Sequence, residues 1–233
     1  MNSRTVELAR DLRQSALTVL CFPEVTGQVS VEDLVQRMNA TVARGTAFAV
    51  TADRFVTCNH VIQNAQPRFL RLIGPGLNHN VIETNCDPHL DVALLRTERV
   101  EGDVVPIPFE PGPPLVGLDI LAVGYPFPEQ RPAEVIQNEH RINVNAALTF
   151  RAIRGIIASR LPDGLQFEID KHVNPGQSGG PVVSIETGRL VGMCRQFRWF
   201  QQQDQPRMAA DLGVCLGAEA IRGKLNEWGV PIQ

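Results

Sequence analysis

The sequence lacks a long apolar run, an excess of charge of either sign and a cysteine pairing motif. No stretch reaches the roughly 18 apolar residues that a transmembrane helix needs, so we expect no membrane association. The 22 basic and 25 acidic residues give a net charge of −3, which offers no electrostatic reason to expect nucleic acid as the main partner. At 233 residues, 43% of them hydrophobic, the chain is long enough to bury a core.

Cysteine usage and the N-terminal segment both favour a reducing compartment. The cysteines are scattered, odd in number and without a CxxC pair: Cys21, Cys58, Cys86, Cys194 and Cys215. This pattern predicts free, partly buried thiols rather than a disulfide framework or a zinc site, and we expect no metal and no cofactor. Residues 1–22, MNSRTVELARDLRQSALTVLCF, alternate charged with apolar side chains and lack the apolar core of a secretory signal, which predicts a cytoplasmic protein.

Short β-rich runs separated by glycine and proline dominate the sequence from residue 45 onward, at a spacing typical of all-β sandwiches and barrels. Apolar residues at helical spacing predict short helices at 5–13, 30–38 and 218–228, whereas ALTVLCF at 16–22 reads as a strand. The proline-rich segment 106–117 reads as a linker between two β units. The strands expected after residue 45 are TAFAVT, RFVTCNHVI, RFLRLIG, DVALLR, DILAVGYPF, RINVNAALTF, AIRGIIASR, LQFEID, PVVSI and RLVGMC.

One serine lies among residues suited to special backbone geometry in NPGQSGGP, residues 174–181. Taken alone, Ser178 reads most simply as part of a tight turn. As a nucleophile it needs a base within hydrogen-bond reach and a third group that orients the base. FVTCNHVI offers His60 at the expected end of a hairpin strand, and DPHLDVALLR offers Asp91 before a buried apolar run. The N–H groups of Gly176 and Ser178 can form an oxyanion hole, whose donors are typically worth about 2.7–4 kcal/mol each.

Other polar residues are less suited to this chemistry. Asp87 is a nearby competitor for the orienting acid, but it does not directly precede the apolar run VALL. His79, His89 and His140 lie in polar or turn-rich segments and are expected at the surface. The aromatic and basic stretch RQFRWFQQQDQPR at 195–207 favours a loop at the substrate rim, or a flexible hairpin, over a nucleic-acid patch.

Five motifs occur together: GTAFAV…FVTCNHVI, DPHLDVALLR, LAVGYPF, RGIIASR and FEIDKHVNPGQSGGPVVSIETGRLVG. In this combination the chain resembles a chymotrypsin-fold (trypsin-like) serine protease of the HtrA (Deg-type) branch over roughly residues 45–217. The resemblance implies an all-β fold of two six-stranded antiparallel β-barrels with short N-terminal and C-terminal helices. It also implies that His60 is the general base, Asp91 its orienting acid and Ser178 the nucleophile, with Gly176 and Ser178 supplying the oxyanion N–H groups. The implied activity is that of a serine endopeptidase, which hydrolyses protein or peptide substrates through an acyl-enzyme.

On this resemblance we divide the chain into four parts. These are an N-terminal helix at 1–14, a first barrel at 15–113 with an insertion at 23–42, a second barrel at 114–217 and a C-terminal helix at 218–233. The first barrel is expected to carry the histidine and the aspartate, and the second the serine. The chain stops before the position of the PDZ domains that the family carries, so we expect a protease domain without them.

Three positions depart from the family pattern. Gln177 stands where trypsin-like zymogens carry an aspartate that pairs with a new N-terminal amine, so we expect control by loop ordering or a partner instead. Arg195 stands where relatives place Ser or Thr, and it either pairs with Asp91 or points to solvent. His172 is expected at the floor of the primary substrate pocket, where the lack of a carboxylate argues against a preference for Lys or Arg. The expected pocket residues are His172, Val173, Arg195, Gln196 and Phe197.

Three functional hypotheses follow from these residues. The first is an active serine endopeptidase. The second is a protease-fold binding module whose triad is intact but misaligned through Arg195. The third is a conditional effector, inactive until a protein partner or a small ligand engages the 23–42 insertion or the N-terminal helix.

Overall fold

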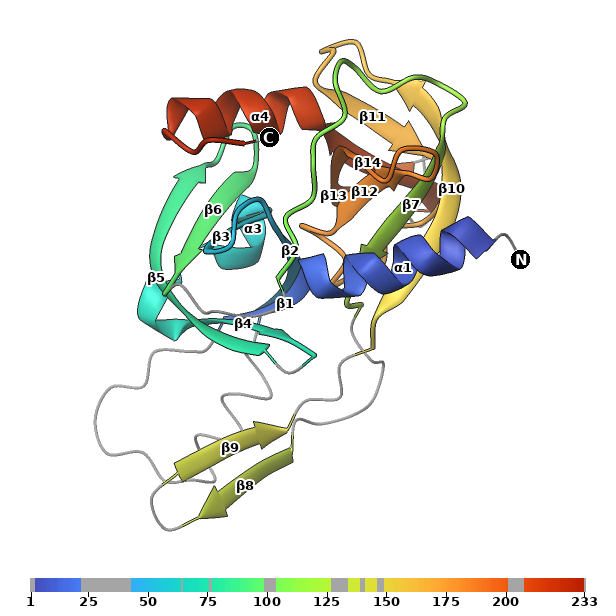
Figure 1. Ribbon diagram of the computed structural model, residues 1–233. Coiled ribbons are helices and arrows are strands. Elements are labelled where there is room, and N and C mark those ends of the chain that lie inside the picture. The colour runs from blue at the N-terminus through green and yellow to red at the C-terminus, as the bar shows by residue number, and fades with distance from the viewer. Residues whose placement is uncertain are drawn as a thin grey trace.

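The computed structural model describes residues 3–21, 43–63, 65–75, 77–98, 104–126, 134–138, 141–145, 149–200 and 208–232. Two closed β-barrels account for most of the described chain, and every strand pair within them is antiparallel (Figure 1). The fold class expected from the sequence, two six-stranded antiparallel barrels with short terminal helices, is confirmed.

The first barrel closes because its first strand pairs with two partners. The strand order is β1-β2-β3-β6-β5-β4, and β1 pairs with both β2 and β4. In β4 the side chains alternate between buried and half-buried, which is the period of a strand with one face toward a core. The strands are β1 (Ala16–Cys21), β2 (Ala43–Ala49), β3 (Arg54–Thr57), β4 (Leu70–Gly74), β5 (Leu77–Asp87) and β6 (Val92–Thr97).

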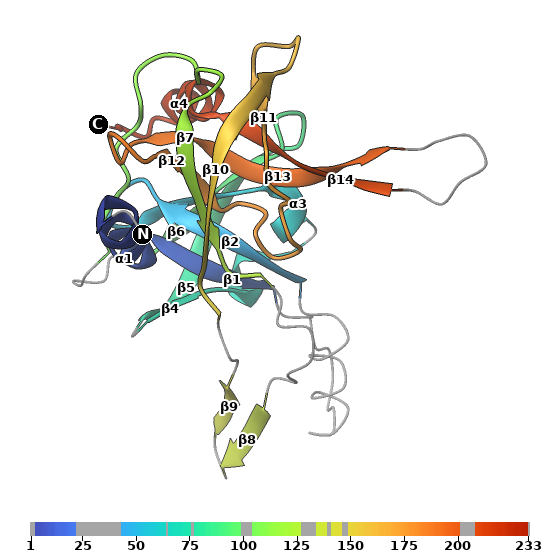
Figure 2. The ribbon, with the colours of Figure 1, turned by 90° about the vertical axis from the view of Figure 1, so that its right-hand side faces the viewer.

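The second barrel has the order β10-β11-β14-β13-β12-β7. Strands β13 and β14 form a hairpin that extends beyond the barrel (Figure 2). Strands β8 (Glu134–Asn138) and β9 (Arg141–Asn145) pair with each other in a separate two-stranded sheet. The barrel strands are β7 (Asp119–Gly124), β10 (Arg151–Arg160), β11 (Gln166–Ile169), β12 (Pro181–Ser184), β13 (Leu190–Phe200) and β14 (Met208–Gly217).

Short helices pack onto the barrels at both ends of the chain. Helix α1 (Ser3–Ser15) buries Leu8, Leu12 and Ser15, which lie on one face because they are four and three residues apart. Helix α4 (Ala218–Glu227) buries Ala218, Ile221 and Leu225 by the same spacing. Along the chain, a one-turn helix α3 (Asn59–Ile62) and a 3₁₀ turn η1 (Pro67–Phe69) lie between strands β3 and β4 of the first barrel. None of the helices in the described ranges combines the length and apolar character that crossing a membrane requires.

The larger of two apolar clusters continues across the boundary between the barrels. It joins first-barrel residues such as Phe48 and Leu95 to Tyr125, Val183 and Met193 of the second half. Because this apolar contact is continuous, the two barrels are held as one body, and a site between them keeps its geometry. The smaller cluster fills the second barrel and consists of Ile120, Ala122, Ile157, Phe167, Ile169, Val173, Val182, Val191, Cys194 and Cys215.

Several sequence expectations need correction. RFVTCNHVI is not one strand, because β3 ends at Thr57 and His60 lies in α3. Residues 195–200 belong to strand β13, which pairs with β14 in a hairpin, so of the two alternatives for 195–207 the structure shows the hairpin in its described part. Strands β5, β8 and β14 were missed, and β5 was missed because its sequence, LNHNVIETNCD, is largely polar. The insertion at 23–42 with its expected helix, His140 and residues 201–207 lie outside the described residues.

His79 is buried, contrary to the expectation that it lies at the surface. Its side chain is on the inward face of β5, only 5% exposed, and its ring lies 6.2 Å from that of Phe55. Neither ring nitrogen has a hydrogen-bond partner among the described residues. Burial therefore lowers the pKa of His79 from its ordinary value, because the charged imidazolium is disfavoured in an apolar site.

Replacing His79 with leucine should make the stability of the protein less dependent on pH. The unfolded chain binds a proton at His79 below about pH 6.5, whereas the folded chain resists it, so wild-type stability should fall as pH drops through this range by up to about 1.4 kcal/mol per pH unit. Urea denaturation between about pH 5 and 7.5 measures this slope. His89→Leu, at an exposed histidine, should keep the wild-type slope. Equal slopes in the wild type and His79→Leu would contradict the account.

Candidate active site

Helix α3 presents His60 at the surface of the first barrel. Val61 and Ile62 are buried beneath the helix and fix its position, while 45% of the His60 side chain is exposed. Cys58, which directly precedes the helix, is also fixed, because its thiol donates a hydrogen bond to the carbonyl of Cys194 at 3.3 Å. The rigid support expected for His60 is therefore provided by a buried helical turn rather than by a strand end.

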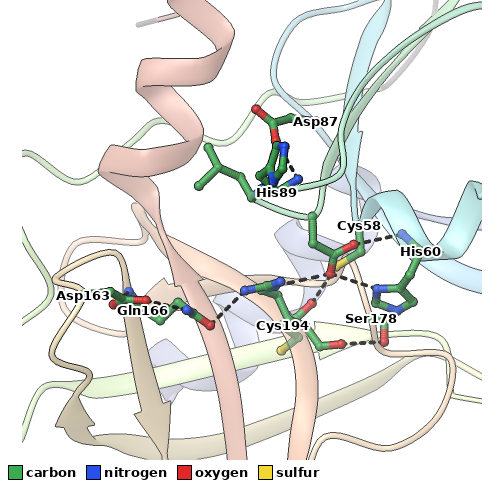
Figure 3. A network of polar contacts seen from close by, with 11 residues as sticks. Cys58, His60, Asp87, His89, Asp163, Gln166, Ser178 and Cys194 are labelled. Carbon is green, nitrogen blue, oxygen red and sulfur yellow. Dashed lines mark hydrogen bonds and ion pairs between the residues drawn. The ribbon is translucent and has the colours of Figure 1, made fainter.

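Asp91 lies directly before β6, as the sequence suggested, and its carboxylate faces His60. Oδ1 accepts from the backbone N–H of His60 at 2.9 Å, and Oδ2 lies 2.9 Å from His60 Nδ1 (Figure 3). Asp91 has a left-handed backbone with φ of 56°, a conformation that aspartate tolerates better than most residues. Burial raises the pKa of Asp91, but the hydrogen bonds from His60 and the charge of Arg195 outweigh it and lower the pKa below its usual value.

The competing carboxylate, Asp87, has a structural role in the turn before Asp91. Its Oδ1 accepts from the backbone N–H groups of His89 and Leu90, each at 2.9 Å. Its Oδ2 lies 2.8 Å from Nζ of Lys224 on helix α4. The hydrogen bond with Lys224 is the main cause of the lowered pKa of Asp87. The structure thus separates the two carboxylates, and only Asp91 reaches His60.

The loop NPGQSGGP wraps around Ser178 in a conformation that depends on glycine. Gly176 and Gly179 have positive φ values of 91° and 84°. A Cβ atom at Gly179 would lie 2.0 Å from the carbonyl oxygen of Thr46, so no other residue fits there. Within the part of the chain that the structure describes, the backbone N–H groups of Gly176 and Ser178 have no acceptor. They are available to a negatively charged oxygen next to Ser178.

Thr46 fastens this loop to the first barrel, and sequence reasoning missed it. Its buried hydroxyl donates to the carbonyl of Gly176 at 2.8 Å and accepts from the N–H of Tyr125 at 3.0 Å. Its backbone N–H donates to the carbonyl of Ser178 at 2.8 Å. A threonine in GTAFAV is an ordinary strand residue in the sequence, so only the meeting of the two barrels reveals its function in holding the loop.

Gln177 holds the loop from within. It is 1% exposed, and its Oε1 accepts from the backbone N–H of Asn174 at 2.8 Å and from the Asn174 side chain at 3.1 Å. A buried neutral amide therefore holds the loop, without a carboxylate at this position.

Arg195 reaches Asp91, which decides between the two placements left open by the sequence. Arg195 Nε donates to Asp91 Oδ2 at 3.2 Å, and Nη1 donates to Gln166 Oε1 at 2.8 Å. The backbone carbonyl of Arg195 accepts the hydroxyl of Ser178 at 2.9 Å. The acceptor of the Ser178 hydroxyl therefore lies on strand β13 in this conformation.

A cleft of about 640 Å³ brings the expected residues together. His60, Asp91 and Ser178 line it, as do Gly176 and three expected pocket residues: Val173, Arg195 and Gln196. His172 is half-buried and is not among the described lining residues, and the side chain of Phe197 lies outside the described part. In this cleft a single bound molecule can therefore contact the serine, the imidazole and the two free N–H groups at once.

A metal ion fits this cleft poorly, although Cys58, His60 and Asp91 place one ligand atom each within 4.8 Å of one another. Burial and the charge of Asp91 raise the pKa of the Cys58 thiol well above its usual value, so the sulfur stays protonated. The Asp91 oxygens are already engaged by His60 and Arg195. These residues are better suited to hydrogen bonding than to binding a cation.

Comparison with known proteins supports the resemblance seen in the motifs. The family model described as "Trypsin-like peptidase domain" matches residues 45–193. A Pseudomonas putida (strain GB-1) protein named "Probable periplasmic serine endoprotease DegP-like" is 29% identical over 171 residues, which are 69% of this chain and 31% of that protein. "Protease Do-like 1, chloroplastic" of Arabidopsis thaliana is 29% identical over 189 residues, 76% of this chain and 40% of that protein. The chain thus spans well under half the length of these curated relatives.

Solved structures share the fold at lower identity. The Rv3671c protease from M. tuberculosis in its active form aligns with a TM-score of 0.67 at 19% identity, over 99% of this chain and 88% of that chain. A serine endoprotease from Yersinia pestis aligns with a TM-score of 0.65 at 18% identity, over 98% of this chain and 67% of that chain. The curated relatives are named as periplasmic and chloroplastic, so the cytoplasmic location expected from the sequence stays a prediction.

Replacing Thr46 with valine should loosen the loop around Ser178. Valine keeps the shape but leaves the buried Gly176 carbonyl and Tyr125 N–H unpaired, which should cost about 1–3 kcal/mol of unfolding free energy. The labelling of Ser178 by a fluorophosphonate should slow in parallel. Thr46→Ser keeps the hydroxyl and should retain most of both properties. A valine variant with wild-type stability and labelling would show that the hydroxyl does not hold the loop.

Proposed function

Since the chain belongs to the family of trypsin-like peptidase domains and is similar to proteins named as DegP-like serine endoproteases, we propose that it is a serine endopeptidase that cleaves peptide bonds through an acyl-enzyme formed on Ser178. One observation carries the assignment of residues. Asp91 and His60 are joined by a contact of 2.9 Å, and the cleft that holds them also holds Ser178 and the free backbone N–H groups of Gly176 and Ser178.

His60 is the proposed general base. The Asp91 carboxylate accepts at Nδ1, so the proton of the neutral ring lies on Nδ1 and the lone pair lies on Nε2. Rotation of the Ser178 side chain releases its hydroxyl from the Arg195 carbonyl and turns it toward Nε2. Nε2 takes the proton as Oγ attacks the peptide carbonyl carbon, and the imidazolium then gives that proton to the departing amine. Water repeats the sequence on the acyl-enzyme and regenerates the serine.

The oxyanion is proposed to bind between the N–H groups of Gly176 and Ser178. Both are free of acceptors among the described residues, and Thr46 holds the intervening peptide through the Gly176 carbonyl. Because these donors are fixed before substrate arrives, they stabilise the developing negative charge with little reorganisation. The loop is thus suited to the transition state rather than to the planar carbonyl of the substrate.

The proposed substrates are proteins or peptides without Lys or Arg at the cleaved residue. Asp91 is the only carboxylate among the described lining residues, and it is already paired with His60 and Arg195. A cationic substrate side chain would therefore lose its hydration without gaining a counter-charge. Hydrophobic, small polar and acidic side chains remain the expected choices.

Control is proposed to come from ordering of the Ser178 loop or from a partner, not from N-terminal cleavage. The buried Gln177 amide accepts from Asn174 and offers no carboxylate to a new N-terminal amine. The second candidate function, a conditional protease, is favoured by one observation. The Ser178 hydroxyl donates a hydrogen bond to the Arg195 carbonyl at 2.9 Å. This hydrogen bond must break before the hydroxyl can give its proton to His60 and attack a substrate.

A fluorophosphonate probe and a peptide-library cleavage profile test the proposal directly. The wild-type protein should label and cleave, and Ser178→Ala should do neither while keeping the wild-type denaturation curve. The profile should contain few products ending in Lys or Arg. A folded wild-type protein that labels no faster than Ser178→Ala would remove the enzyme assignment and leave the binding module. Cleavage that appears only with a partner present would favour the conditional protease.

Extending the chain at its N-terminus, which moves the terminal amine, should not change the reactivity of Ser178. A chain with a short Gly-Ser extension ahead of Met1 should label with the fluorophosphonate at the same rate as the unextended chain, because Gln177 cannot form the activating ion pair. A matched extension after Gln233 serves as the control. Loss of labelling in the N-terminal extension alone would show that the amine does take part.

A further inference from the structure

One oxygen of Asp91 is shared between two cationic or potentially cationic groups. Oδ2 lies 2.9 Å from His60 Nδ1 and 3.2 Å from Arg195 Nε. The side chains of Arg195 and Asp91 are only 17% and 14% exposed. The attraction between them is therefore screened much less than that of a surface pair, and the guanidinium is a permanent charge at this site.

The guanidinium is held in place from its far side. Its Nη1 donates to Gln166 Oε1 at 2.8 Å, and Gln166 Nε2 donates to Asp163 Oδ2 at 2.5 Å. Asp163 lies in the turn between β10 and β11, where its Oδ1 also accepts from the backbone N–H of Leu165 at 2.9 Å. Figure 3 shows Asp163 and Gln166 on one side of this network and His60 and Ser178 on the other. The position of the Arg195 charge is thus set by the second barrel.

This arrangement opposes the protonation of His60. Removing the proton from Ser178 makes an imidazolium, which is stabilised by the negative charge of Asp91. Arg195 already compensates part of that charge and also repels the new cation. Both effects oppose the transition state, in which a positive charge develops on the His60 ring beside the Arg195 guanidinium.

We propose that Arg195 is a positioning residue that restrains the His60–Asp91 pair, and that Gln166 holds it in the restraining position. The inference rests on the proposed function, because the restraint matters only if His60 is the base. Breaking the contact between Arg195 and Asp91 raises the rate of acylation. A ligand that draws the guanidinium away from Asp91 therefore activates the enzyme.

The test compares Arg195→Met and Arg195→Ser with the wild type. Methionine removes the charge and keeps much of the side-chain length, whereas serine removes the charge and supplies a short hydroxyl. Both variants should raise kcat/KM about tenfold, mainly through kcat, and should move the acidic limb of its pH profile upward by about one pH unit. Arg154→Met is the matched control, because Arg154 pairs with Asp119 at 3.2 Å on the exposed surface of the same barrel. It should leave both quantities unchanged.

A second measurement separates the restraint from the enzyme assignment. In the Ser178→Ala background, NMR titration of the His60 ring should show a higher midpoint when Arg195 is methionine than when it is arginine. Folded variants with an unchanged titration, or an unchanged or lower kcat/KM, would overturn the inference. A wild-type protein without fluorophosphonate labelling would instead count against the proposed function, while the titration would still decide the effect of Arg195 on His60.

Discussion

The Asp91 carboxylate is the contact on which the site depends. It holds the backbone and the ring of His60 through its two oxygens, and it receives Arg195 from the other barrel. Its own backbone must stay in a left-handed conformation for the carboxylate to face the helix. A small displacement of Asp91 would therefore affect the orientation of the imidazole, the protonation of its ring and the position of the guanidinium together.

The rest of the fold supports that carboxylate from several directions. Asp87 fixes the preceding turn, and Lys224 connects this turn to helix α4. Val61 and Ile62 are buried beneath helix α3, so the helix that carries the His60 ring is packed against the core. The Asp91 carboxylate is likewise carried by a turn that is held in place. The apolar cluster that crosses between the barrels keeps these elements at a fixed position relative to the loop around Ser178. The geometry of the cleft is thus a property of the whole core and not of the loops alone.

Features that depend on local sequence pattern, such as the fold class and the residues of the cleft, could be predicted from the sequence. Contacts that depend on how distant strands pair could not. Short β runs and turns predicted an all-β fold, and the family resemblance carried by the five motifs implied two barrels and the set His60, Asp91 and Ser178, which the structure brings into one cleft. Their catalytic roles stay predictions. The helix at His60 was misread because the strand-like residues before Asn59 and His60 are followed at once by Val61 and Ile62, and β5 was missed because its sequence is largely polar. The contact from Arg195 to Gln166 joins β13 to β11 across the intervening β14, and no spacing in the chain predicts it.

The contacts that complete the cleft also determine when it can exist during folding. Thr46 and Gly176 are 130 residues apart, Cys58 and Cys194 are 136 apart, and Asp91 and Arg195 are 104 apart. Contacts of such long sequence separation form late, because the loop between the partners must be closed before they meet. A chain emerging from the ribosome carries His60 and Asp91 long before the Ser178 loop has been made. The cleft therefore becomes complete only after the second barrel has been synthesised and has docked on the first.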